Sequence, residues 1–313
     1  MTSDRICFGV QAGLAAESGA RDWLDLAVKV EDLGFDALYV ADHVGVCASP
    51  FTALGAAAAV TSTLRLGTYV LNCGIRDPCA IASDAATLDH LSAGRVVLGL
   101  GAGHTPSEWT MSGGVYPSAA ARVARLVETV EIVEALLGGE VVTHHGGYLD
   151  LDDATLSFPR PVQPKIPLLV GGNGRALLRL AGRTADVVGL TGLARTLEDG
   201  HRHSVDWRPE AIDERIATVQ TAAVDRRDAP VLDALVQHVE ITERRNDAAE
   251  RCASVILGAS AADVLAAPYA LIGTVDQLVE EVLAHRERFG IASYVVRADA
   301  IDHVAPVIER LRS

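Results

Sequence analysis

Residues 86–104, which read ATLDHLSAGRVVLGLGAGH, decide the fold more than any other stretch of this 313-residue chain. The stretch begins as a helix, passes a Ser-Ala-Gly-Arg turn and continues as an apolar strand over residues 96–100. The strand ends in Gly101-Ala102-Gly103-His104. Because glycine has no Cβ, a flat ligand or a phosphate can approach the backbone there. His104 adds a side chain that exchanges a proton near neutral pH, so the strand end combines two features of a binding site.

The same alternation of strand and helix recurs along the whole chain. Apolar runs predict strands at residues 6–10, 38–41, 65–71, 96–100, 168–170, 186–190, 232–241 and 293–297. Helical spacing predicts helices at residues 21–33, 78–91, 122–137, 174–183, 208–226, from 247 onwards, and at 274–288 and 301–311. Eight strands that alternate with helices are typical of an α/β fold with a parallel barrel. We therefore expect a single (β/α)8 TIM-barrel domain over residues 1–313.

Three segments depart from this alternation. Residues 140–151 predict a β-hairpin insertion, with Gly146-Gly147 at its turn. Residues 191–208 are polar and without a clear period, which predicts a mobile loop at the C-terminal face of the barrel. Residues 105–122 form the other loop expected to determine specificity. Neither of these two loops contains a motif, so the sequence does not identify a substrate.

The composition narrows the classes of partner. The formal net charge is −14 and no basic run occurs, which argues against nucleic acids and anionic membranes. The five cysteines show no CxxC spacing and no signal peptide precedes them, which predicts reduced thiols in the cytoplasm. Residues 44–64 carry no charge, but Pro50 and the small side chains predict a loop and a buried helix. A small-molecule substrate is the expected partner.

Five motifs, in this order along the chain, carry a resemblance to a known family. They are ALYVADH at residues 37–43, TLRLGTYV at 63–70, ATLD-x-LS-x-GR-x-x-LGLGAG at 86–103, and the segments 161–174 and 271–290. Together they resemble the bacterial luciferase-like superfamily, and most closely its branch that uses the deazaflavin coenzyme F420. The resemblance covers nearly the whole chain. It implies an oxidoreductase with a TIM-barrel fold. It also implies a homodimer, because members of the family are usually dimeric.

The resemblance implies a position for the coenzyme ring. Asp42 and His43 directly follow a predicted strand, where the family places a cofactor-facing Asp-His pair; without the resemblance they would be a surface loop. The family carries a non-prolyl cis peptide that supports the ring, and the match puts it at Tyr69-Val70, close to Asn72. Gly101, Ala102 and Gly103 would lie beside the ring edge. These residues are the candidate ring-binding set.

Candidate proton donors follow the glycine-rich strand end. F420-dependent relatives that oxidise sugar phosphates carry a glutamate where His104 stands, and this difference argues against transferring their substrates to this chain. His104 or His43 would exchange a proton with the substrate during hydride transfer. Glu108, one helical turn after His104, is an alternative acid. A purely structural role for His104 stays open. Trp109 could wall a substrate pocket or simply pack.

A second glycine cluster, Gly171-Gly172-Asn173-Gly174, lies between a predicted strand and a predicted helix. Free N–H groups at a helix N-terminus bind anions. The resemblance implies that the coenzyme phosphate binds here, and Arg175 would add positive charge. An ordinary glycine-rich turn is the alternative. Neither cluster is a GxGxxG and the chain has no GxxxxGK[ST], which argues against Rossmann and P-loop folds.

A metal site is not expected. His144-His145 falls in the hairpin and His201-Arg202-His203 in a loop, with no carboxylate or cysteine placed to complete a site, and no HExxH occurs. The sequence therefore favours an F420-dependent oxidoreductase that transfers a hydride between the deazaflavin C5 and a small organic substrate. An FMN-dependent luciferase-like monooxygenase and a non-catalytic flavin-binding barrel are the alternatives.

Overall fold

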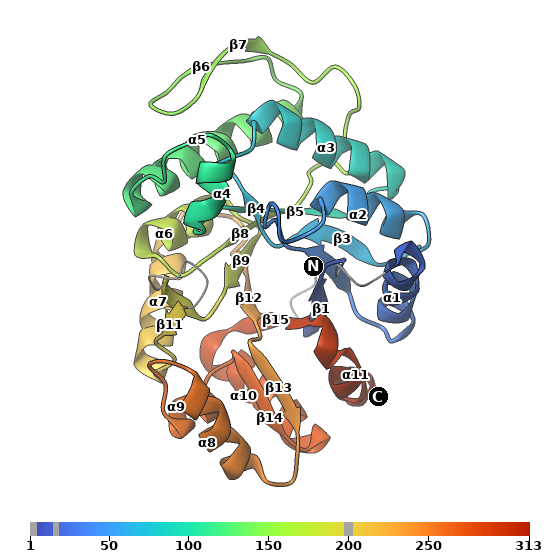
Figure 1. Ribbon diagram of the computed structural model, residues 1–313, viewed down its shortest axis with the longest axis vertical. Coiled ribbons are helices and arrows are strands. Elements are labelled where there is room, and N and C mark those ends of the chain that lie inside the picture. The colour runs from blue at the N-terminus through green and yellow to red at the C-terminus, as the bar shows by residue number, and fades with distance from the viewer. Residues whose placement is uncertain (1–4, 15–18, 197–202) are drawn as a thin grey trace. The chain divides into compact units, whose positions relative to one another are not determined.

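The chain divides into two compact units, which are described in turn. The structure, a computed structural model, describes residues 5–14, 19–196 and 203–313. The N-terminal unit comprises Ala12–Glu31 and Ala37–Val170. The C-terminal unit comprises Met1–Gln11, Asp32–Asp36 and Gly171–Ser313. Figure 1 shows the elements of both units along the chain.

Parallel strands form the centre of the N-terminal unit. They are β2 (Ala37–Val40), β3 (Arg65–Thr68), β4 (Leu71–Asn72), β5 (Val96–Gly101) and β8 (Leu168–Gly171). β2 pairs with β3, and β5 pairs with β3, β4 and β8. Both faces of β5 are buried, which agrees with its continuous apolar run. The helices of this unit are α1 (Ala20–Asp32), α2 (Pro50–Ala58), α3 (Pro78–Leu91), α4 (Pro106–Met111) and α5 (Ala119–Gly138).

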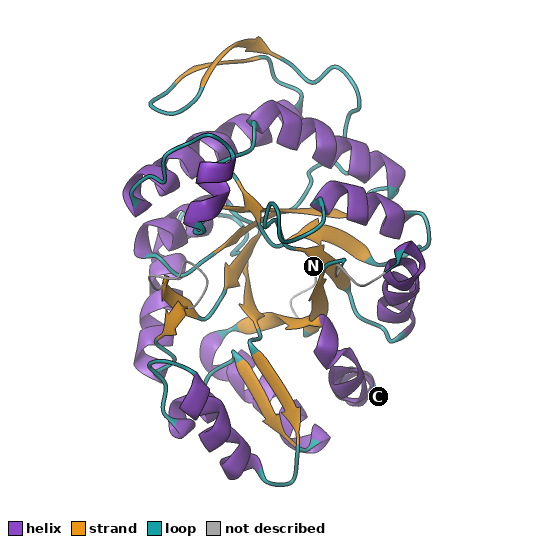
Figure 2. Cartoon of the chain, in the orientation of Figure 1, coloured by secondary structure: helices purple, strands orange, loops and turns teal. Residues whose placement is uncertain are grey.

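The C-terminal unit repeats this arrangement. Its parallel strands pair in the order β1 (Cys7–Ala12), β15 (Ile291–Arg297), β12 (Val231–Leu235) and β9 (Val187–Leu190). Its longer helices are α6 (Arg175–Thr184), α7 (Pro209–Ala222), α8 (Arg245–Val255), α10 (Val275–Phe289) and α11 (Ile301–Arg312). Two short helices complete the unit, α9 (Ala261–Ala266) and η1 (Ala298–Ala300). Figure 2 shows the alternation of strands and helices.

The element order confirms the predicted fold class. Eight parallel strands, each followed by at least one helix, give a (β/α)8 TIM barrel; they are β1, β2, β3, β5, β8, β9, β12 and β15. Local signals in the sequence fix several helix ends. Asp77 caps α3 ahead of Pro78, and Thr274 and Gln277 form a capping box on α10. Gly290 ends α10 with a φ of 70°.

The predicted strand over residues 232–241 is wrong, because two strands occupy this segment. β12 ends at Leu235, and β13 (His238–Ile241) pairs in parallel with β14 (Ala270–Gly273). Between them, the backbone N–H of Gln237 donates to Tyr269 O, outside the ladder that β12 forms with β15. An unbroken apolar run does not reveal such a change of partner. β14 itself was not predicted, because four apolar residues before a helix carry little strand signal.

The two predicted insertions have different outcomes. The hairpin is confirmed as antiparallel β6 (Val142–His145) and β7 (Asp150–Ala154). Glu128 on α5 accepts hydrogen bonds from the backbone N–H groups of residues 147, 148 and 149, which fixes the turn of the hairpin against the helix. The loop over residues 191–208 instead contains a short antiparallel pair, β10 (Leu193–Thr196) and β11 (His203–Val205). Residues 197–202 of that loop lie outside the described part of the chain.

The uncharged segment over residues 44–64 forms a loop and the largely buried helix α2, as predicted. Throughout residues 5–14, 19–196 and 203–313, no helix has both the length and the apolar character that a membrane span requires.

Candidate active site

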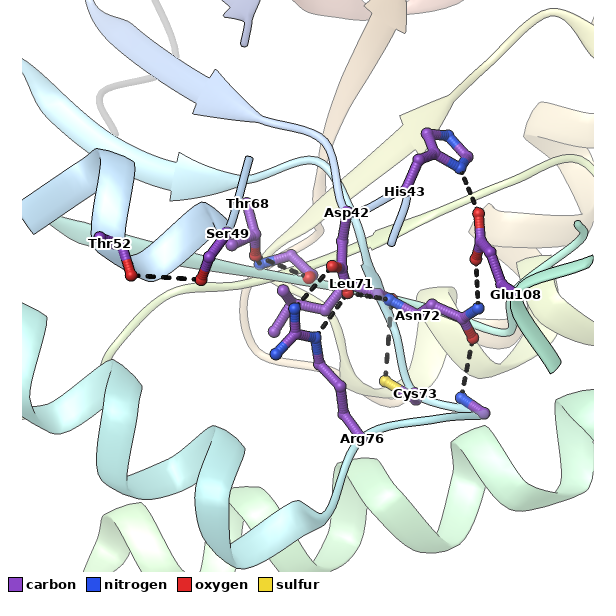
Figure 3. A network of polar contacts seen from close by, with 12 residues as sticks. Asp42, His43, Ser49, Thr52, Thr68, Leu71, Asn72, Cys73, Arg76 and Glu108 are labelled. Carbon is purple, nitrogen blue, oxygen red and sulfur yellow. Dashed lines mark hydrogen bonds and ion pairs between the residues drawn. The ribbon is translucent and has the colours of Figure 1, made fainter. Parts of the chain in front are cut away.

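Asp42 lies just beyond the end of β2, and its carboxylate is fully engaged by protein groups. Its side chain is 2% exposed. Arg76 donates two hydrogen bonds of 2.6 Å to the Asp42 carboxylate, from Nε to Oδ2 and from Nη2 to Oδ1. The backbone N–H of Asn72 donates a third, of 3.0 Å, to Oδ2. Figure 3 shows this arrangement. Such a two-point guanidinium–carboxylate contact fixes geometry strongly, so Asp42 is placed to hold Arg76 and the backbone at Asn72.

Glu108 joins two of the predicted site residues. Its Oε1 lies 2.6 Å from His43 Nδ1, and its Oε2 accepts a 2.7 Å hydrogen bond from Asn72 Nδ2. Asn72 Oδ1 in turn accepts from the backbone N–H of Gly74. The buried ends of β2, β4 and α4 therefore meet in one polar network (Figure 3). This network orients the imidazole of His43, whose side chain is 37% exposed.

The environment of Glu108 favours its charged form. Burial alone would raise the pKa of this carboxyl group. The hydrogen bonds from His43 and Asn72, together with the positive charges that His43 and His104 can carry, outweigh burial and leave the pKa below its usual range. An ionised carboxylate accepts hydrogen bonds and does not donate a proton. The geometry therefore favours Glu108 as a residue that positions His43, and not as the acid.

His104 lies next to His43. The two imidazole rings meet edge to face, with their centroids 5.4 Å apart. The hydroxyl of Tyr116 donates to the backbone oxygen of His104, which holds the loop after β5. Both histidines are partly exposed, whereas Glu108 beneath them is buried. Imidazole and carboxylate groups are the side chains that general acid–base catalysis uses most often.

The glycines at the end of β5 pack closely against other parts of the N-terminal unit. A Cβ at Gly99 would overlap the backbone oxygen of Thr68, and one at Gly101 would overlap the side chain of Val70. Gly103 has a φ of 71°, and a Cβ there would overlap the amide of Asn72. Close packing of the protein itself therefore requires glycine at these positions. The sequence could not reveal this, because the packing partners are distant along the chain.

The predicted cis peptide bond at Tyr69-Val70 is confirmed. The ring of Tyr69 is buried and meets the ring of Tyr39 edge to face, with centroids 5.6 Å apart. Ala102 is partly exposed between Gly101 and Gly103. Tyr69, Val70, Asn72 and Ala102 thus line the same strand ends as His43 and His104.

Trp109 packs inside the N-terminal unit. Its ring is 7% exposed and covers Gly74, where a Cβ would overlap it. It meets the ring of Tyr116 edge to face, with centroids 6.4 Å apart. Its Nε1 is buried without a hydrogen-bond partner within the described ranges. Of the two roles predicted for Trp109, the geometry supports packing against the loop after β5.

The second glycine cluster belongs to the C-terminal unit, between β8 and α6. Gly174 is the N-cap of α6, no side chain caps the helix, and the space around the Gly174 Cα is open. Asn173 donates from Nδ2 to Leu193 O, while its buried Oδ1 has no partner in the part of the chain that the structure describes. Uncapped N–H groups, open space and Arg175 at the first helical position fit a phosphate group.

Sequence reasoning missed Arg76. Nothing in its own neighbourhood signals a function. A buried aspartate at a strand end does predict that some cation must lie nearby, because a buried carboxylate requires a partner. The partner could not be chosen from the sequence alone, since the chain contains 27 lysines and arginines.

The histidines of the hairpin have carboxylate neighbours, but these contacts do not form a metal site. His144 Nε2 lies 3.3 Å from Glu128, and His145 pairs with Asp150 and Asp152 through opposite ring nitrogens. The contact of His144 reaches helix α5, whereas those of His145 cross the hairpin to β7. Among the described residues, no group of three His, Cys, Asp or Glu side chains is arranged to hold a metal ion. His201 and Arg202 lie outside the described residues.

Comparison with known proteins establishes the class of this chain. The profile of the luciferase-like monooxygenase family matches residues 5–293. The chain belongs to the luciferase-like monooxygenase family, as its motifs indicate.

Curated relatives of known name are similar to part of this chain. The chain is 40% identical over 194 residues to the F420-dependent glucose-6-phosphate dehydrogenase of Nakamurella multipartita. That alignment covers 59% of this chain and 56% of the relative, so the chain spans about half the length of the curated relatives it matches.

Two solved structures share the fold over nearly their whole length. The F420-dependent tetrahydromethanopterin reductase of Methanopyrus kandleri has a TM-score of 0.77 at 21% identity, covering 98% of this chain and 99% of that one. The monooxygenase RslO1 of Streptomyces bottropensis has a TM-score of 0.74 at 23% identity, covering 97% of each chain. The same fold thus occurs in an F420-dependent reductase and in a monooxygenase, so the fold alone does not distinguish these two activities.

Proposed function

We propose that this protein is an F420-dependent oxidoreductase that transfers a hydride between the deazaflavin C5 and a small organic substrate. The observation that carries the proposal is the 40% identity to a relative named for F420-dependent dehydrogenation. The geometry of the N-terminal unit supports it, because His43, His104 and Glu108 form a cluster suited to proton transfer beside a redox coenzyme.

The cofactor-binding residues that the resemblance implies are proposed for each unit by itself. In the N-terminal unit, His43, the Tyr69-Val70 peptide, Asn72 and residues 101–103 would face the ring, and Asp42 would position Asn72. In the C-terminal unit, Gly171, Gly172, Asn173, Gly174 and Arg175 would hold the phosphate. When bound, the coenzyme supplies or accepts the hydride; the protein supplies orientation and charge.

The proposed division of labour among the ionisable groups follows from their contacts. Glu108, kept ionised, orients His43 through Nδ1. His43 and His104 are the groups that can give a proton to the substrate or take one from it. The family resemblance puts His104 where relatives that oxidise sugar phosphates carry glutamate, so we propose a substrate other than a sugar phosphate. We further propose that the protein works as a homodimer in the cytoplasm.

An FMN-dependent monooxygenase is the second candidate, because RslO1 shares the fold over 97% of the chain. A non-catalytic flavin-binding barrel is disfavoured, since such a protein has no use for an ionised Glu108 that orients His43 beside a second histidine.

Turnover under argon separates these candidates. Reduced and oxidised F420 are each mixed with the protein and a panel of alcohols, aldehydes, ketones and sugar phosphates, and the deazaflavin absorbance is followed. The proposal expects a protein-dependent change of F420 absorbance without oxygen. Turnover that needs both reduced FMN and oxygen would contradict it and support the monooxygenase.

A further inference from the structure

Helix α6 of the C-terminal unit carries a row of arginines. Arg175, Arg179 and Arg183 are four residues apart, so they lie on one face of the helix, and all three are exposed. The opposite face buries Leu177, Leu178, Leu180 and Ala181 against the core. The helix is therefore fixed by its apolar side, and the arginine row is presented outwards over about 12 Å, at 1.5 Å per residue.

The arginine row is unusual for this chain. The protein has 41 acidic and 27 basic residues, and several arginines elsewhere pair with carboxylates, as Arg76, Arg251 and Arg288 do. Within residues 5–14, 19–196 and 203–313, none of the three arginines on α6 has an ion pair or hydrogen bond. An acidic protein that leaves three neighbouring guanidinium groups without anions presents a site for an anionic ligand.

The arginine row borders a groove of about 680 Å³ between α6 and α7. Asn173, Arg175, Arg179 and Arg183 line one side. Arg215 and Thr218 on α7 line the other, together with the acidic Glu214. Arg215 is held by a 2.7 Å hydrogen bond from Nη1 to Asp206 O. Four guanidinium groups thus face a groove that contains one carboxylate.

We propose that this groove binds the oligoglutamate tail of coenzyme F420, an inference that rests on the proposed function. F420 ends in a phosphodiester followed by γ-linked glutamates, each of which adds a carboxylate. Guanidinium groups bind carboxylates through paired N–H donors, which a row of arginines can repeat along a chain of carboxylates. The row is long enough for more than one glutamyl unit.

The order of groups along the groove matches the order of groups along the coenzyme. The groove begins at Asn173 and Arg175, beside the uncapped N-terminus of α6, where the phosphate is proposed to bind. Arg179 and Arg183 follow along the helix. No aromatic side chain lines the groove, whereas single-stranded nucleic acids are usually held by stacking on aromatic rings. A flexible polycarboxylate therefore fits the groove better than a nucleic acid does.

The test compares deazaflavins that differ only in their tails. Affinities are measured by fluorescence titration for long-tailed F420, for F420 with one glutamate, and for the same deazaflavin that keeps the phosphodiester but carries no glutamate. The wild type should bind more tightly as the tail lengthens, and the gain should shrink at high salt because exposed charge pairs are screened. Each arginine should contribute roughly threefold, as exposed ion pairs do.

Variants then assign the gain to the groove. The double substitution Arg179→Gln/Arg183→Gln should lose about tenfold in affinity for long-tailed F420, the product of two such pairs, and almost nothing for the tail-free compound. Arg21→Gln, an exposed arginine on α1, is the matched control and should change neither affinity. Circular dichroism of each variant checks that the fold is retained.

Three results would overturn the inference, and they separate it from the proposed function. Equal affinity of the wild type for short and long tails contradicts the tail site and leaves F420 binding intact. If the double variant loses as much affinity for the tail-free compound as for long-tailed F420, the substitutions act on the structure in general and not on a tail site. Failure of every deazaflavin to bind contradicts the proposed function together with the tail site.

Discussion

At the scale of single residues, the proposed chemistry centres on the His43 imidazole, whose orientation is set by the buried carboxylate of Glu108. His43 contacts Glu108 at 2.6 Å, Asn72 holds the other carboxylate oxygen, and His104 lies against His43. The pKa of Glu108 lies below its usual range because hydrogen bonds and nearby positive charge outweigh its burial. This arrangement is the basis for our proposal that the histidines transfer the proton.

Substitution of the two histidines should have different consequences. His104→Ala should slow turnover by about 10²–10⁴-fold, the usual contribution of a general acid, while F420 affinity stays within a few fold. His43→Ala should also weaken F420 binding, because the side chain that Glu108 orients is removed. Steady-state kinetics and F420 titration measure the two effects. His303→Ala, exposed on α11, is the control. Full activity in both His43→Ala and His104→Ala would contradict the account.

A buried carboxyl group in the C-terminal unit should make stability depend on pH. Glu281 on α10 lies 3.1 Å from Arg245, and its Oε1 has no partner among the described residues. Burial raises the pKa of Glu281 to about 8, against the opposing charge of Arg245. His285 and Tyr294 are also buried; burial raises the pKa of Tyr294, and the charge of Glu281 raises it further.

The sign follows from comparing the folded and unfolded chains. The folded pKa lies above the ordinary value of 4.5, so this carboxyl group lowers stability as the pH rises from about 4.5 to about 8. Glu281→Gln cannot ionise, and its melting temperature should fall less than that of the wild type between pH 5 and pH 8.5. Glu280→Gln, exposed on the same helix, is the control. Parallel curves for wild type and Glu281→Gln would show that the buried carboxyl does not titrate as described.

At the scale of elements, the ends of strands and the starts of helices carry the proposed binding groups. β2, β4 and β5 end in the residues of the histidine cluster, and β8 leads into the uncapped N-terminus of α6. Gly172 has a φ of 145°, so a side chain there would be strained. Gly174 has an ordinary φ of −68° and open space around it, which makes it the better position for a test.

Two substitutions of similar shape at Gly174 separate helix capping from anion binding. Aspartate and asparagine both cap helices well, so Gly174→Asp and Gly174→Asn should fold with unchanged or slightly higher melting temperatures. Only aspartate places a negative charge where the phosphate is proposed. Gly174→Asp should therefore bind F420 about tenfold more weakly than Gly174→Asn, which corresponds to about 1.4 kcal/mol. Equal affinities in a titration of the two variants would place the phosphate elsewhere.

Sequence patterns predicted some elements well and others poorly, for physical reasons. Local sequence signals predicted strand β5 and three of the helices. A continuous apolar run marked β5, and caps together with a helical period marked α3, α5 and α10. The split of residues 232–241 into β12 and β13 depends on partners far away in the chain. The same holds for the site: His43 and Glu108 are 65 residues apart, and the pairing of Asp42 with Arg76 has no local signature.

At the scale of the whole molecule, the family determines the fold but leaves the cofactor open between two chemistries. The TIM barrel is shared with an F420-dependent reductase and with a monooxygenase at similar TM-scores. What distinguishes the candidates is the ligand that the chain prefers. The acidic protein surface has one exposed arginine row without partners in the described part of the chain, and F420 carries more negative charge than FMN. The proposed function therefore predicts a clear preference between two soluble ligands.

The most direct test is a calorimetric titration of the purified wild-type protein with F420 and, separately, with FMN in the same buffer. The account predicts saturable binding of F420 and an affinity for FMN at least tenfold lower, a difference of about 1.4 kcal/mol or more. Tighter binding of FMN than of F420 would contradict the central claim and make the FMN-dependent monooxygenase the better description of this protein.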